Sequence, residues 1–156
     1  DRYRYENLVE ITNKELKNSK VVIIGSIYRK NITSLPEAIE KFVKNNPDKK
    51  FIFIAPFPKL NKNPIRINRG YKMDRNKDNH YNVSYQEIPE SVKKIIDNNS
   101  NAYMISIDFH KLEGLPFRKG ITMYYDEDHM NEYGTTILAN EFGDEFYKEL
   151  KNIIEK

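Results

Sequence analysis

The chain has 156 residues, a length typical of one domain, and we expect residues 1–156 to form a single domain. Hydrophobic residues make up 38% of it, enough for a core, and 26 basic against 23 acidic residues give a net charge of only +3, which does not point to nucleic acid. The absence of cysteine excludes disulfides, thiol catalysis and cysteine-rich zinc sites, and no apolar run approaches the ~20 residues that cross a bilayer. No signal peptide is visible and the chain begins at Asp1 rather than Met, so we expect it to be an excised or processed piece of a longer protein.

Apolar runs and amphipathic segments alternate through the first third of the chain. Residues 8–16 carry a short helix-like stripe, and residues 21–24 form a continuous β-branched run closed by Gly25, typical of a strand buried on both faces. Residues 34–43 predict a helix that opens with a Ser cap and a first-turn Pro. Residues 51–55 predict a second buried strand, because two prolines stop the run directly after it.

The rest of the chain continues this alternation after a long polar segment. Residues 61–82 are rich in Lys and Arg, and we interpret them as a surface loop, with a substrate lid as the alternative. Residues 85–96 predict a helix and residues 102–107 a third strand. Asn131 is placed to cap a long final helix. The inner face of that helix carries the apolar side chains Ile137, Leu138, Phe142, Phe146, Leu150 and Ile153.

Strands that alternate with helices predict the α/β class, as a three-layer α/β/α sandwich with a mainly parallel sheet of flavodoxin-like type. In such sheets, ligands bind beyond the carboxyl ends of the strands. Gly25 and Pro56 each follow a predicted strand, and the segment 126–129 precedes the final helix. We therefore expect all three to border one crevice.

The segment 124–134, with the sequence YYDEDHMNEYG, carries the most chemistry. Asp126 stands three residues before His129, so a tight turn can fold its carboxylate back onto the imidazole. A carboxylate on one ring nitrogen fixes the tautomer and stabilises the imidazolium, while the other nitrogen is left to take a proton from a hydroxyl. This is the acid–base part of a Ser-His-Asp site.

Other interpretations of the same segment stay open. Three acidic residues and a His within four positions also suit a solvated loop, and Asn131 also suits a plain helix cap. Carboxylates and imidazole ligate metals, but a site normally needs three or four convergent ligands, and His80 and His110 stand alone in the sequence. We therefore expect no metal and no cofactor.

The same segment resembles the last conserved block of the SGNH (GDSL-like) hydrolases, and it is most similar to the version in SGNH domains fused to membrane acyltransferases of the acyltransferase-3 type. A Leu-Ser pair usually follows the His in that group, and Met130 and Asn131 depart from it. The resemblance covers most of the chain in order, but only this block is specific. It implies an enzyme that transfers or hydrolyses an O-acyl group, acetyl above all, on a cell-envelope carbohydrate. His129 would be the general base and then acid, and Asp126 its orienting partner.

The resemblance also implies a location and partners. The domain would be extracytoplasmic, in the periplasm or at the cell surface. Its substrate would be an envelope glycan or a small acyl ester, and a fused or associated membrane acyltransferase domain would be its partner.

The Gly-Asp-Ser block that supplies the nucleophile in this family is not evident in the chain. The nearest string is Gly25-Ser26 after the first predicted strand. In one interpretation Ser26 is the nucleophile of a degenerate block. In the other, which the spacing to His129 favours, Gly25 and Ser26 belong to the oxyanion wall and Ile27 replaces the usual Asn. The first βα unit and its Ser would then lie outside these 156 residues, or the domain would be catalytically dead.

Two other sets of residues are candidates for the site. Tyr124 and Tyr125 precede the Asp-His loop, and we predict that they line the substrate, since aromatic rings stack on the apolar face of sugars. Ser106, Asp108 and His110 alternate, which would put them on one face of a strand, but nothing there exposes a nucleophile.

Two competing functions remain. The first is a non-catalytic carbohydrate- or partner-binding module on a degenerate SGNH scaffold, which the missing Ser block supports. The second is nucleic-acid binding through the basic residues of the segment 62–77. Asp74, Asp78 and the small net charge argue against it, and we expect no nucleic-acid partner.

Overall fold

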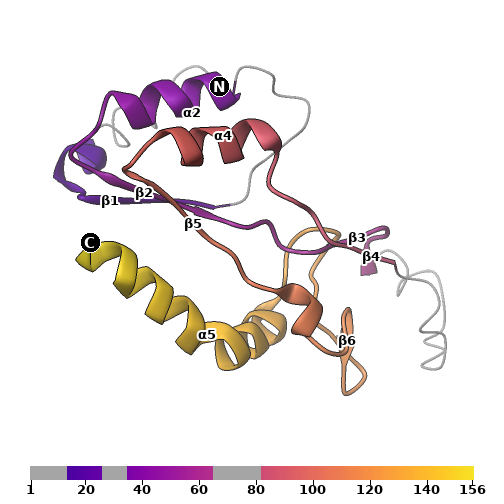
Figure 1. Cartoon of the computed structure of the whole chain (residues 1–156). Coiled ribbons are helices and arrows are strands. Elements are labelled where there is room, and N and C mark those ends of the chain that lie inside the picture. The colour runs from indigo at the N-terminus through magenta and orange to yellow at the C-terminus, as the bar shows by residue number, and fades with distance from the viewer. Residues whose placement is uncertain (1–13, 26–34, 65–81) are drawn as a thin grey trace. The chain divides into compact units, whose positions relative to one another are not determined.

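The structure is a computed structural model that describes residues 14–25, 35–64 and 82–156 (Figure 1). These residues divide into two compact units. Unit 1 contains residues 14–25, 35–54, 88–105 and 153–156, and unit 2 contains residues 55–64, 82–87 and 106–152. The expectation of one domain is not tested by this division and stays a prediction. Within the described residues, no helix combines the length and the apolar character that a membrane span requires.

Unit 1 is built on a parallel sheet of three strands in the order β1-β2-β5. They are β1 (Val21–Ile24), β2 (Lys50–Ile54) and β5 (Ala102–Ile105). In the register, Phe51 of β2 lies beside Val22 of β1 and Ala102 of β5. The central strand is the most buried, because Phe51, Ile52 and Phe53 are all 0% exposed. The continuous apolar runs of the sequence therefore do form parallel strands, and the predicted α/β class is confirmed.

Two helices of unit 1, α2 (Leu35–Lys44) and α4 (Glu90–Asn98), lie together over one face of this sheet (Figure 1). The rings of Phe42 and Phe51 meet edge to face at 5.2 Å between centroids, which joins α2 to the central strand. The expected helix over 85–96 instead begins at Glu90, with Pro89 as its N-cap in an extended conformation. A proline disfavours helical backbone in the residue before it, which accounts for a helix start after Pro89 rather than at residue 85.

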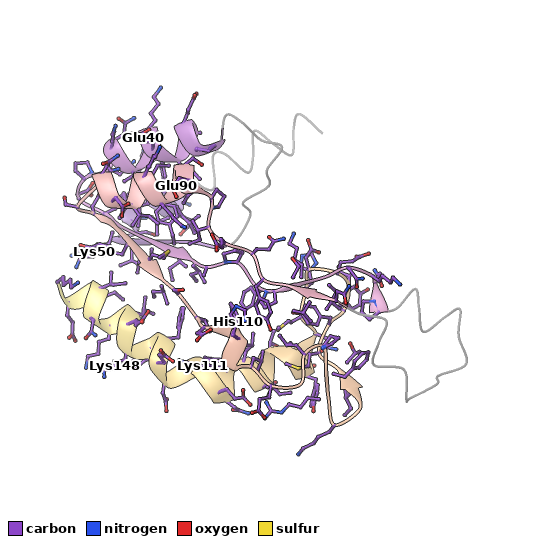
Figure 2. All side chains as sticks on the ribbon, turned by 45° about the vertical axis from the view of Figure 1, so that its right-hand side comes forward. Glu40, Lys50, Glu90, His110, Lys111 and Lys148 are labelled. Carbon is purple, nitrogen blue, oxygen red and sulfur yellow. The ribbon has the colours of Figure 1, made fainter. Side chains whose placement is uncertain are left out.

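Two polar side chains of unit 1 donate hydrogen bonds to backbone carbonyls where helices end. The Asn101 side-chain amide donates to the backbone carbonyls of Val43, Asn46 and Lys49 at 3.4, 3.1 and 3.1 Å, which satisfies the turn after α2. The Lys50 ammonium, labelled in Figure 2, donates to the carbonyls of Ile153 and Ile154 at 2.9 Å each. These carbonyls end the last helix, where a cation is favoured by the helix dipole.

Unit 2 has two short antiparallel ribbons and most of one long helix. β3 (Lys59–Leu60) pairs with β4 (Val83–Ser84), and β6 (Phe117–Arg118) pairs with β7 (Ile121–Thr122). The helix α5 (Glu132–Glu155) follows, its residues up to 152 belonging to this unit. The core of unit 2 gathers buried side chains from β3, from α5 and from the segments 109–112 and 123–124, namely Leu60, Phe109, Leu112, Met123, Tyr124, Leu138 and Phe142. This core anchors both ends of the segment that carries Asp126 and His129.

Candidate active site

A tight turn brings Asp126 back onto the residues that follow it. Its Oδ1 accepts hydrogen bonds from the backbone N–H groups of Asp128 at 3.0 Å and His129 at 2.7 Å. An Asp that bonds the backbone two residues ahead forms an Asx turn, which fixes the chain direction without regular structure. The turn therefore follows from placing an Asp at this position.

The same turn places the imidazole of His129 on the Asp126 carboxylate. The ring Nδ1 lies 2.9 Å from both carboxylate oxygens, so the contact expected from the three-residue spacing is present. The His129 side chain is 73% exposed, against 24% for Asp126. The other ring nitrogen, Nε2, hydrogen-bonds none of the described residues. An Asp on Nδ1 leaves the Nε2 lone pair of the neutral ring available to accept a proton.

The electrostatics of the pair favour the charged form of both partners. Burial alone would raise the pKa of Asp126, but hydrogen bonds from the Asp128 and His129 N–H groups and from the His129 ring lower it below its usual value. The pKa of His129 is raised, first by its hydrogen bond to Asp126 and then by the charges of Asp126 and Asp128, with Lys59 acting in the opposite direction. The pair thus stabilises an imidazolium, as an acid–base catalyst requires.

The turn is the tip of a closed ring of backbone formed by residues 124–130, the Asp-His ring. Tyr124 and Met130 form an antiparallel bridge at its base, and the Tyr125 N–H donates to the His129 carbonyl at 2.8 Å. The positions of Asp126 and His129 are therefore fixed by bonds within a few residues.

The start of α5 explains two further residues of the 124–134 segment. The side-chain oxygen of Asn131 accepts from the Gly134 N–H at 2.9 Å, which confirms the predicted cap, and its amide donates to the Thr122 carbonyl at 2.7 Å. Gly134 packs against the backbone of Met123, and an added Cβ would approach the Met123 carbonyl oxygen to below 3.0 Å, a distance that real Cβ atoms do not show. The glycine is needed because α5 meets the backbone that directly follows β7 with no room for a side chain.

The two tyrosines of the segment differ from each other. Tyr125 is 63% exposed next to His129, so the prediction that it lines a substrate site stays open. Tyr124 is 1% exposed, and its hydroxyl donates to the Pro58 carbonyl at 2.8 Å. The prediction that Tyr124 lines the substrate is therefore corrected, since its ring is part of the core. Burial raises its pKa, and the charge of Tyr85 raises it further.

A second segment, residues 58–63, holds the Asp-His turn from outside, and nothing in the sequence pointed to it. The Leu60 N–H donates to the Glu127 carbonyl at 2.8 Å, and the Asn63 amide donates to the Glu127 carboxylate at 3.3 Å. The Lys59 ammonium lies 3.3 Å from the Asp128 carboxylate. Contacts between residues more than sixty positions apart leave no local signal, so only the structure shows them.

The Asp-His turn also gathers three groups of the kind that bind metals. Single donor atoms of Asp126, Asp128 and His129 lie within 4.8 Å of one another. Both carboxylates, however, already face one ring nitrogen, Nδ1, at 2.9 and 3.3 Å. Such a set is smaller than the four ligands usual for a structural zinc, and the expectation of no metal stays a prediction.

The remaining candidates lie elsewhere. Gly25 directly follows β1 in unit 1, whereas Ser26 lies outside the described residues, as do residues 65–81 of the basic segment. The predicted strand over 102–107 ends at Ile105, so the alternating face expected for Ser106, Asp108 and His110 does not form. Asp108 instead caps a 3-10 helix, η2 (Phe109–Lys111), through the His110 N–H.

Known proteins offer little that is similar to this chain. No protein-family model matches the chain, and no curated protein sequence matches it either. One solved structure is similar, the periplasmic domain of a lipopolysaccharide acetyltransferase from Salmonella ser. Paratyphi A, at 22% identity and a TM-score of 0.45. The match covers 81% of this chain and 56% of that one, so this chain spans little more than half of that domain.

Proposed function

We propose that this chain carries the acid–base pair of an SGNH-type acyl-transfer site, which moves or hydrolyses an O-acyl group, acetyl above all, on an envelope carbohydrate. One observation carries the chemistry: Nδ1 of His129 lies on the Asp126 carboxylate, and the His129 side chain is 73% exposed. The substrate class, the extracytoplasmic location and an associated membrane acyltransferase domain rest on the resemblance of the 124–134 segment.

The pair would act as a proton carrier. Nε2 of His129 removes the proton from a nucleophilic hydroxyl, whose oxygen attacks the acyl carbonyl to form a tetrahedral intermediate. The imidazolium is stabilised by the Asp126 carboxylate, and it then returns the proton to the leaving oxygen. In the second half of the reaction Nε2 activates water, giving hydrolysis, or a sugar hydroxyl, giving transfer.

This proposal fixes the direction of the pH dependence. His129 accepts a proton only when neutral, and its pKa is raised by Asp126. Turnover should therefore increase as the pH rises through that pKa, and the acid limb of the rate profile should lie above the usual value of 6.5. Asp126→Asn removes the stabilising charge and should move this limb to lower pH while lowering the maximum rate.

The first experiment measures hydrolysis of p-nitrophenyl acetate by the chain, and by any longer gene product that contains it. We expect His129→Ala to abolish turnover and Asp126→Asn to lower it by roughly 10³–10⁴, the loss expected when the orienting carboxylate is removed. His110→Ala is the matched control, because His110 is also exposed but its ring stacks on Tyr85 at 3.9 Å and donates no hydrogen bond to Asp108, which accepts from the His110 backbone N–H instead. Turnover that survives His129→Ala contradicts the proposal.

The nucleophile is identified in the same preparations. A fluorophosphonate probe labels a serine that a triad activates, and mass spectrometry locates the adduct. Labelling and turnover that both disappear in Ser26→Ala make Ser26 the nucleophile. If turnover is insensitive to that change, Gly25 and Ser26 belong to the oxyanion wall and another Ser acts. The absence of labelling and turnover in every form favours the carbohydrate-binding module, which sugar titrations would then test.

A further inference from the structure

Asp128 is a second carboxylate on the nitrogen that Asp126 orients. Its Oδ1 lies 3.3 Å from Nδ1 of His129, compared with 2.9 Å for Asp126. In the neutral tautomer that donates from Nδ1, this nitrogen carries a single proton, so it can make one strong hydrogen bond at a time. The two carboxylates therefore compete for it, and the ring direction depends on which one prevails.

Lys59 contacts one of these two carboxylates, Asp128. Its ammonium lies 3.3 Å from the other oxygen of Asp128, Oδ2, so the Asp128 carboxylate bridges Lys59 and His129. Asp126 has no ion pair with a lysine or arginine among the described residues, and its bonds go to the turn itself. A cation on Asp128 therefore weakens only the competing carboxylate.

The backbone on both sides of Lys59 is attached to the segment that carries Asp128. Directly before it, the Pro58 carbonyl accepts from the hydroxyl of the buried Tyr124, and directly after it, the Leu60 N–H donates to Glu127. Both bonds join β3 to the ring of residues that carries the pair. The Lys59 and Asp128 side chains are 40% and 43% exposed, and this backbone attachment brings them within reach of each other.

We propose that Lys59 is a positioning residue for His129, which holds Asp128 back from the ring and leaves Asp126 as its orienting partner. The catalytic meaning of this role rests on the proposed function, whereas the positioning itself does not. Three charged groups face the imidazole in the described part of the chain: Asp126 and Asp128 from its own turn and Lys59 from β3.

The test is an NMR titration of the His129 ring, which follows its pKa and its tautomer. Lys59→Met should raise the pKa of His129, because Asp128 then interacts with the ring without a competing cation. Lys59→Arg, which keeps the charge, should restore the wild-type value. Lys62→Met is the matched control, since Lys62 is exposed on the same segment and forms no ion pair with the described residues; it should leave the value unchanged.

The route through Asp128 is tested by a double-mutant cycle. Asp128→Asn should lower the pKa of His129, and in that background Lys59→Met should shift it much less than in the wild type. Equal shifts in both backgrounds, or no shift in either, overturn the proposal. A ring that stays in its tautomer and keeps its pKa in Asp126→Asn would instead overturn the acid–base pair itself, which separates the two failures.

An activity measurement adds the functional consequence. In a form of the protein that turns over ester, Lys59→Met should move the acid limb of the rate profile to higher pH, with a smaller change in rate on the alkaline plateau. A uniform loss at every pH would show a structural role and would contradict the positioning role.

Discussion

The two units reach a defined structure by different means. In unit 1 the strands are continuous apolar runs, and the central strand β2 is buried along Phe51, Ile52 and Phe53. In unit 2 the strands are two residues long, and the Asp-His ring is defined by single contacts such as Tyr124 hydroxyl to Pro58 carbonyl. A core held by buried apolar surface tolerates small changes of side chain, whereas a segment held by single hydrogen bonds does not tolerate the loss of one partner. The difference shows that the candidate site depends on a few specific bonds.

The largest expected effect tests unit 1. Phe51→Ala removes a ring that is 0% exposed and packed edge to face on Phe42, and it should cost about 4 kcal/mol of unfolding free energy. Denaturant unfolding measures the loss, and Phe51→Leu, which keeps most of the volume, should cost well under half as much. Hydrogen exchange should locate the loss in β1, β2 and β5. Equal loss of protection in the Asp-His ring would contradict the contrast between the units.

The next effect tests a single steric fit in unit 2. Gly134→Ala places a Cβ against the Met123 carbonyl and should cost roughly 3 kcal/mol, at the upper end of the range for overpacking. Gly143→Ala is the control in the same helix: a Cβ there meets nothing within 4 Å, and it should be neutral or stabilise by roughly 0.5–1 kcal/mol. Thermal unfolding of both variants gives the comparison, and equal behaviour would refute the account of Gly134.

A smaller effect separates two bonds of one side chain. Asn131→Ala loses both the cap to Gly134 and the bond to the Thr122 carbonyl, and should cost about 2 kcal/mol. Asn131→Asp keeps the acceptor that caps the helix but not the donor, so it should cost about half of that. Unfolding curves measured well above the Asp pKa decide this. If Asn131→Asp lowers the unfolding free energy as much as Asn131→Ala does, the helix cap contributes little to stability.

The smallest effect is the pH dependence of stability due to the pair. The raised pKa of His129 gives stability that is full below 6.5 and is lost as the pH rises through the folded-state pKa. The lowered pKa of Asp126 gives stability that is full above 3.8 and is lost as the pH falls through its folded-state pKa. The difference between wild-type and His129→Gln stability should therefore be greatest between these two values. A difference that is flat with pH would show that the pair is not coupled in solution.

The success of the sequence-based predictions follows the same division. β1 has the bounds expected for it, and β2 begins and ends one residue earlier than expected, because an apolar run is a local signal. The Asn131 cap and the Asp126–His129 contact were also predictable, since each spans three residues. The antiparallel ribbons β3–β4 and β6–β7 were not predicted, because strands of two residues are too short to show a periodic pattern in the sequence.

The errors concern contacts between distant segments. The burial of Tyr124 depends on a hydroxyl bond to Pro58, sixty-six residues away, and the attachment of Lys59 to Asp128 spans sixty-nine. Neither the residue types nor their spacing in the sequence indicates such long-range contacts. The role expected for Tyr124 was wrong for this reason, and Lys59 was overlooked as part of the site for the same reason.

The backbone ring closed by Tyr124 and Met130 has one more consequence, which concerns reorganisation during the reaction. Bonds that span at most six residues order the imidazole when this backbone ring folds. The loss of conformational entropy that fixes the imidazole therefore occurs during folding, before any substrate binds. A pre-ordered dipole loses little free energy by reorienting as charge develops on it. The imidazole is therefore already ordered, and the hydroxyl that meets Nε2, from whichever segment it comes, is the group that still has to be positioned.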